Sequence, residues 1–301
     1  MSLPKTETVS AGPHIDTRPD LDAAAFLLDG KAAAIDAVRI AAPAVSRGAQ
    51  RMASAIRAGR CIHYAAAGSS GLMGLADASE LRGTFGILSE KIHVHMAGGV
   101  PVDGHMPGDT EDDEASVARI AAEMARGDVV IVLTASGSTP YALAVARAAQ
   151  HNSAAVIGIA NNADTPLLEL ADEPICLATP PEVVAGSTRL AAGTAQKAAL
   201  NLMSTLMGIE LGHVYRGEMV NVIADNAKLV RRATGMVSRI AGVSAGAAEA
   251  AIATTQGRVK PAILVAAGCT PEGAVSMLEQ YNGHLGPCLS SLTSHQSNTS
   301  K

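Results

Sequence analysis

The chain is poor in aromatic residues, which make up 2% of its 301 residues, and it contains no tryptophan. Stacking surfaces for nucleic-acid bases or for the faces of sugar rings are therefore scarce. The net charge is -5 and no basic stripe occurs, so binding to nucleic acid is not expected. No apolar run has membrane-spanning length, and the N-terminus lacks a charged start followed by an apolar run, so no membrane segment is expected.

Cysteine is also scarce, and its pattern excludes the common metal and redox motifs. The four cysteines, at positions 61, 176, 269 and 288, show no Cys-x-x-Cys spacing. They predict free thiols in a reducing cytoplasm. Hydrophobic residues make up 48% of the chain and charged residues 17%, which predicts a packed globular protein with a large core.

The first two thirds of the chain predict an α/β fold. Residues 1–20 are polar and are interpreted as a flexible tail, and residues 21–57 predict two helices, with Asp20 as the first cap. From residue 60 to 180 short apolar runs alternate with helical patterns. Strands are expected near 61–66, 91–96, 128–133, 154–160 and 174–178, and helices near 71–80, 113–126 and 140–150. Such runs are typical of a parallel sheet covered on both faces.

The last third is helical. Helices are expected over 189–211 and 218–240, which closes a domain at residues 21–240. Residues 241–290 contain a repeat with a spacing of 26 residues, in which Ser244 matches Thr270 and Gly257 matches Gly283. A hydroxyl residue can cap the start of a helix and a glycine can end it, so the repeat predicts two helical hairpins. Residues 291–301 are interpreted as a second flexible tail.

Two loops of similar composition each follow a predicted strand. The sequence AGSSG occupies residues 67–71, and TASGSTP occupies residues 134–140. A hydroxyl-rich glycine loop at the start of a helix offers backbone N–H groups and hydroxyls to an anion. The alternative is that both are ordinary turns between a strand and a helix. The phosphate-binding candidates are Ser69, Ser70, Ser136, Ser138 and Thr139.

Other polar residues carry less information by their spacing. Glu80 ends the helix after the first loop, and Glu111 lies in an acidic cluster typical of a helix N-terminus. His93 and His95 share one face of a strand, but a third metal ligand at a recognisable spacing is missing, so no metal site is predicted. Lys197 lies on a helix, where lysine is usually solvated.

Several of these segments resemble one family. The sequence DASE at 77–80, the loop from 135 to 141 and the run from 181 to 205 resemble the N-acetylmuramic acid 6-phosphate etherases. The run from 181 to 205, which includes Ser187 and Lys197, is the most specific of them. The resemblance extends from about residue 20 to 289.

The resemblance implies a sugar isomerase domain with a flavodoxin-like parallel sheet between helices and a small helical C-terminal appendage. It also implies a cytoplasmic homodimer with the site near the subunit interface, and a lyase that needs no metal or organic cofactor. Such an enzyme eliminates D-lactate from a phosphorylated amino sugar and adds water. The family's two acidic residues fall on Glu80 and Glu111, and Ser187 and Lys197 join the phosphate-binding candidates. Glu80 is expected to act on the ether oxygen and Glu111 on the carbon-bound proton.

The sequence departs from the family's pattern in both loops. Leu72 and Ser138 stand where the family commonly has arginine, and Leu81-Arg82-Gly83 replaces Cys-Pro-Pro. Each missing arginine would be able to pair with a phosphate or a carboxylate. Two alternatives therefore stay open: an isomerase or lyase acting on another amino-sugar phosphate, and a non-catalytic regulator that binds sugar phosphates.

Overall fold

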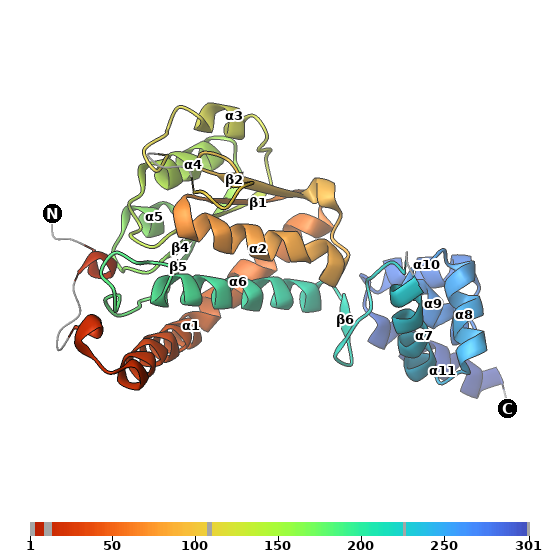
Figure 1. Cartoon of the computed structure of the whole chain (residues 1–301). Coiled ribbons are helices and arrows are strands. Elements are labelled where there is room, and N and C mark those ends of the chain that lie inside the picture. Colours follow the sequence, from red (N-terminus) through yellow and green to blue (C-terminus); the bar gives the residue numbers. More distant parts are fainter. Residues whose placement is uncertain (1–3, 9–13, 107–109, 225–226, 300–301) are drawn as a thin grey trace. The chain divides into compact units, whose positions relative to one another are not determined.

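The computed structural model describes residues 4–8, 14–106, 110–224 and 227–299. They divide into two compact units, one of residues 1–79 and 89–206 and the other of residues 80–88 and 207–301 (Figure 1). The sequence pattern predicts a boundary at residue 240. The helix from Ala227 to Ala241 buries Ala233, Met236 and Val237 in the core of the second unit.

The first unit is built on a five-stranded parallel sheet in the order β2-β1-β3-β4-β5. The strands are β1 (Ile62–Ala66), β2 (Ile92–Met96), β3 (Val129–Thr134), β4 (Ala155–Ala160) and β5 (Glu173–Cys176). This strand order confirms the flavodoxin-like parallel sheet that the family resemblance implies. The central strands β1 and β3 are buried along their whole length, as expected for strands covered on both faces.

Helices cover both faces of this sheet (Figure 1). One face packs in a core with residues of α3 (Val117–Ala121), α4 (Pro140–His151) and α5 (Pro166–Leu170). On the other face lie α1 (Asp20–Arg57), α2 (Gly68–Phe85) and α6 (Ala191–Glu210). Close packing there places Gly48 of α1 against Ile157 and Ile175, and Gly74 of α2 against Tyr64.

The prediction of two helices over 21–57 is wrong, because α1 is one helix that contains Pro43. Its buried residues, including Ala34, Ala37, Val38, Ala41 and Val45, form a single stripe that continues past the proline. A proline inside a helix removes one backbone hydrogen bond. Burial of a continuous apolar stripe offsets the loss of this hydrogen bond. The N-cap residue of α1 is Pro19, and Asp20 is the first residue of the helix.

Part of the N-terminal segment is also ordered. Residues Lys5–Glu7 form a 3-10 helix, η1, and Thr6 is fully buried. The Asn162 amide donates to Thr6 Oγ1 at 3.2 Å, and the Lys5 backbone N–H donates to Asn162 Oδ1 at 2.9 Å. These residues therefore pack against the first unit, in contrast to the expected flexible tail. A second 3-10 helix, η2, spans Ile15–Thr17, and a third, η3, spans Ser89–Lys91.

The second unit confirms that the C-terminal region is helical. After a short hairpin of β6 (Val214–Tyr215) and β7 (Glu218–Met219), five helices follow: α7 (Ala227–Ala241), α8 (Ala245–Thr254), α9 (Val259–Ala266), α10 (Pro271–Gln280) and α11 (Leu285–Thr299). The hydroxyls of Ser244 and Thr270 cap α8 and α10, and Gly257 and Gly283 have positive φ at the turns. Because α11 extends to Thr299, it enters the region expected as a tail.

No single helix among the described residues is long and apolar enough to cross a membrane. The pair α9 and α10 passes on length and composition only when taken together, and it is bent by 114° between the two helices.

Candidate active site

The two hydroxyl loops lie at the carboxyl ends of β1 and β3, which are neighbours in the sheet. In this strand order the connections from β1 and β3 leave in opposite directions, so a crevice opens between the two strand ends. A pocket of about 280 Å³ lies there. Its lining consists of Glu7, Ala67, Ser69, Ser70, Glu111, Leu133, Thr134, Ala135, Ser136, Thr139, Gly186 and Thr188.

The second loop is held by its own hydroxyls. Thr134 Oγ1 lies 2.7 Å from Thr139 Oγ1 and 3.2 Å from Ser136 Oγ, and the Ser138 backbone N–H donates to Ser136 Oγ at 3.3 Å. Thr139 directly precedes α4, whose N-terminal N–H groups favour an anion. The loop therefore presents Ser136 and Thr139 together at a helix N-terminus.

Gly137 allows the loop to turn this sharply. Its φ is +78°, a conformation that side-chain-bearing residues rarely adopt. A Cβ at this position would lie 2.3 Å from Thr165 Oγ1, which is too close for any side chain. Its carbonyl also accepts a hydrogen bond from the Leu167 N–H at 3.1 Å. The glycine thus joins the loop to the N-terminus of α5.

Glu111 reaches the pocket from the segment before α3. Its backbone carbonyl accepts a hydrogen bond from the Tyr141 N–H in the first turn of α4, at 3.0 Å. Its Oε1 lies 3.1 Å from the position that a Cβ on Gly68 would take. The carboxylate thus lies beside the first residue of α2, between the two loops. The Glu111 side chain is exposed, so its carboxylate can reach a bound molecule.

Glu7 is a pocket residue that the sequence analysis missed. It belongs to η1, and its Oε2 lies 3.1 Å from a Cβ position on Gly186. The Gly186 N–H donates to the Thr6 carbonyl at 3.2 Å, which fixes η1 against the segment from 184 to 188. A polar N-terminal segment without hydrophobic periodicity gives no signal for such a contact. The described lining contains two carboxylates and neither lysine nor arginine.

The structure brings five of the nine candidates to the pocket, namely Ser69, Ser70, Glu111, Ser136 and Thr139. Ser138 is exposed next to the lining, and Ser187 lies between the lining residues Gly186 and Thr188. Lys197 is exposed on α6. Glu80 is exposed near the end of α2 and belongs to the second compact unit.

Asp77 in the DASE segment is a structural residue. It is buried and accepts hydrogen bonds from Tyr64 OH at 2.9 Å, the Asn201 amide at 2.8 Å and Ser204 Oγ at 3.0 Å. These bonds join α2 to β1 and α6. Burial and the neighbouring carboxylate of Asp77 raise the pKa of Tyr64 well above its usual value, so the phenol donates its proton to this bond.

Much of the run from 181 to 205 has a positioning role as well. Glu182 is fully buried, and its carboxylate accepts the N–H groups of Ala191 and Ala192 at 2.9 Å each. A carboxylate at a helix N-terminus satisfies donors that the helix leaves unpaired. Gln196 donates to Asn161 Oδ1 at 2.9 Å, one turn further along α6. These bonds fix the segment that carries Gly186 and Thr188 into the pocket.

Comparisons with known proteins concern the fold and the family. A model described as "SIS domain" matches residues 104–206. Among solved structures, that of a protein from E. coli CFT073, determined as a complex, aligns with a TM-score of 0.50 at 14% identity, covering 67% of this chain and 97% of that one. The first unit therefore contains a SIS domain, and the solved structure shows a similar fold.

Curated relatives identify the family within this class. An N-acetylmuramic acid 6-phosphate etherase of Deinococcus radiodurans is 40% identical over 263 residues, covering 86% of each chain. One from Symbiobacterium thermophilum is 40% identical and covers 74% of each, and one from Yersinia pestis is 38% identical and covers 84% of this chain and 87% of the relative. The chain belongs to the N-acetylmuramic acid 6-phosphate etherase family.

Proposed function

We propose that this protein is a carbon–oxygen lyase that cleaves the D-lactyl ether of N-acetylmuramic acid 6-phosphate, giving N-acetylglucosamine 6-phosphate and D-lactate. The observation that carries the proposal is the pocket in which Glu111 faces two hydroxyl loops, in a chain 40% identical to an etherase over most of its length. The reaction serves the recycling of cell-wall amino sugars.

The phosphate is placed on the two loops. Ser69 and Ser70 start α2, and Ser136 and Thr139 precede α4, so hydroxyls and helix N-termini converge on one volume. The described pocket lining contains neither lysine nor arginine, which supports neutral donors as the phosphate ligands in this proposal. Each hydrogen bond to a charged group is worth about 1.5–3 kcal/mol.

The acid–base chemistry is assigned to Glu111 and Glu80. Once the sugar ring opens, the proton on the carbon beside the aldehyde becomes acidic, and Glu111 removes it. Glu80 protonates the departing ether oxygen and then positions the water that adds to the double bond. The assignment of Glu111 is supported by its place between the loops, and that of Glu80 by its match to the family's acidic residue.

We also propose a cytoplasmic homodimer. Glu111 and Glu80 are exposed in the single chain, whereas carboxyl groups that divide acid and base roles need different and partly desolvated environments. A second subunit would remove water from this edge. All four cysteines are free, as expected for a reducing compartment. Sedimentation at micromolar concentration tests the assembly, and a monomer alone would contradict it.

Substrate identity is tested by a panel of amino-sugar phosphates assayed for D-lactate and for rearranged sugar products. The parent protein is expected to release one D-lactate for each N-acetylmuramic acid 6-phosphate consumed. The loops lack the arginines common in the family, and Ser138 is exposed where one of them would stand. If N-acetylmuramic acid 6-phosphate is untouched while another amino-sugar phosphate is converted, the second candidate, an isomerase or lyase of shifted specificity, replaces the first.

A further inference from the structure

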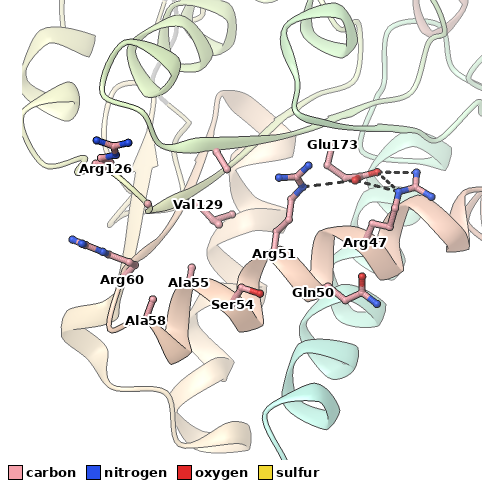
Figure 2. A pocket seen from close by; sticks show the side chains of 12 residues that line it. Arg47, Gln50, Arg51, Ser54, Ala55, Ala58, Arg60, Arg126, Val129 and Glu173 are labelled. Carbon is pink, nitrogen blue, oxygen red and sulfur yellow. Dashed lines mark hydrogen bonds and ion pairs between the residues drawn. The ribbon is translucent and has the colours of Figure 1, made fainter.

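A second and larger pocket lies at the opposite edge of the sheet, where the strands begin. It has a volume of about 700 Å³ and is shown in Figure 2. Val129 and Ala155 are at or next to the first residues of β3 and β4, whereas the candidate active site lies beyond the last residues of β1 and β3. A strand of six residues spans about 20 Å, so the two pockets are separate.

Four arginines line this second pocket in a chain whose net charge is -5. Arg47 and Arg51 come from α1, Arg60 follows the end of α1, and Arg126 precedes β3. Figure 2 shows the two pairs at opposite ends, with Arg47 and Arg51 beside Glu173, and Arg60 and Arg126 apart from them. The pocket therefore has two basic ends.

The end formed by Arg47 and Arg51 is partly neutralised. Glu173 accepts from Arg47 Nε at 3.0 Å and lies 2.9 Å from Arg47 Nη2, while Arg51 Nε is 3.7 Å from its second oxygen. Arg51 also donates to the Asp172 carbonyl at 3.2 Å. One carboxylate thus serves two guanidinium groups, and the carboxylate of the neighbouring Asp172 is engaged with the Val156 N–H at 2.8 Å.

At the other end, neither Arg60 nor Arg126 forms an ion pair among the described residues. The nearest acid in sequence, Asp128, is buried and turned inward. Its oxygens accept from the Cys61 and Ala125 N–H groups, at 2.9 Å and 2.7 Å, and contact His63. Both arginine side chains are exposed. Guanidinium groups are well suited to bind phosphate through two parallel hydrogen bonds.

The surface between the two ends is neutral. Ala55, Ala58, Val129 and Ala155 supply apolar contacts, and Gln50 and Ser54 supply polar ones. The last carbonyls of α1 are capped by the N–H groups of residues 58–60, so they do not present free acceptors here. The volume is within the range of about 300–1,000 Å³ that is usual for small-molecule sites.

We propose that this pocket is a second ligand site, which binds a small organic molecule with two anionic groups, of the sugar bisphosphate class. One phosphate lies between Arg60 and Arg126, the neutral body lies on Ala55 and Val129, and the second anionic group reaches Arg51. The site is independent of the proposed function because it shares no lining residue with the first pocket.

Calorimetry with fructose 1,6-bisphosphate tests the proposal on the full chain. The double variant Arg60→Gln/Arg126→Gln is expected to bind it about 10- to 100-fold more weakly than the parent does, since two charge-assisted contacts are lost. The variant Arg39→Gln/Arg147→Gln removes the same charge at exposed positions outside the pocket and is expected to bind like the parent. The variant Ser136→Ala/Thr139→Ala, altered only in the first pocket, is expected to retain this binding event.

Three results would overturn the proposal. Binding of equal strength by the parent and by Arg60→Gln/Arg126→Gln would exclude these arginines. An equal loss in the charge-matched control would indicate a general effect of net charge. Loss of all binding in the Ser136 and Thr139 variant would place the bisphosphate in the first pocket. Circular dichroism of each variant verifies that it is folded before the titrations are compared.

Discussion

Acidification is expected to destabilise the first unit through a buried histidine pair on β1 and β2. His63 is fully buried and His95 is 7% exposed, and His63 Nδ1 lies 2.9 Å from His95 Nε2. The other nitrogen of His63 lies 3.3 Å from the carboxylate of Asp128. Because a carboxylate only accepts, His63 donates from Nε2 and accepts at Nδ1, and His95 therefore donates from Nε2.

The magnitude follows from the pKa of His95. Burial, together with the positive charge that His63, His93 and Arg119 can carry, lowers this pKa from 6.5 to about 4. The pKa of His63 is also lowered, chiefly by burial and then by His93, while Asp128 and Glu123 oppose that change. Between pH 6.5 and 4 the unfolded chain binds a proton at His95 that the folded chain does not. The free energy of unfolding therefore has its full value above pH 6.5 and decreases as the pH is lowered. At pH 5 it is smaller by about 2 kcal/mol, since one pKa unit corresponds to about 1.4 kcal/mol.

Urea unfolding followed by circular dichroism at pH 7.5 and pH 5.0 measures this loss. The variant His95→Gln can still donate to His63 but does not titrate. Its free energy of unfolding is therefore expected to change between the two pH values by about 2 kcal/mol less than that of the parent. His151→Gln, at an exposed position at the end of α4, is the control. An equal change in the free energy of unfolding between pH 7.5 and pH 5.0 in the parent and in His95→Gln would refute the reasoning.

Two further predictions concern the loop from 134 to 140, and a third concerns Asp77 of α2. Ser136→Ala/Thr139→Ala is expected to weaken binding of a sugar phosphate by at least about 1.5–3 kcal/mol in calorimetry, the value of one hydrogen bond to a charged group, and unchanged affinity would place the phosphate elsewhere. Gly137→Ala is expected to lower the free energy of unfolding by about 2 kcal/mol or more, because its φ is +78° and the new Cβ meets Thr165; urea unfolding measures it. Asp77→Ala is expected to cost about 2–4 kcal/mol in the same assay, because buried donors lose their acceptor, and a change below about 0.5 kcal/mol would contradict its anchoring role.

The sheet was predictable from sequence because its signals are local. The central strands β1 and β3 are short apolar runs, and both lie within a residue of the expected ranges. The hydroxyl loops follow these strands directly, so their meeting at one edge follows from parallel order. The caps at Ser244 and Thr270 were predictable for the same reason.

Features that depend on contacts between distant residues were not predictable. Glu7 reaches the pocket because Thr6 packs against Asn162, 156 residues away. The pairing of His63 with both His95 and Asp128 depends on the register of three strands. The basic pocket unites arginines from α1, from the segment before β1 and from the segment before β3, which no motif connects.

The central claim is that Glu111 removes the carbon-bound proton in a reaction that releases D-lactate. The direct measurement uses N-acetylmuramic acid 6-phosphate in deuterated water and follows both D-lactate and deuterium at C2 of the sugar product. The parent and Glu114→Gln, an exposed neighbour outside the pocket lining, are expected to release D-lactate and incorporate deuterium. Glu111→Gln is expected to release D-lactate and to incorporate deuterium about 100- to 10,000-fold more slowly, while still binding the sugar phosphate. Turnover and deuterium incorporation by Glu111→Gln at the rate of the parent would contradict the account.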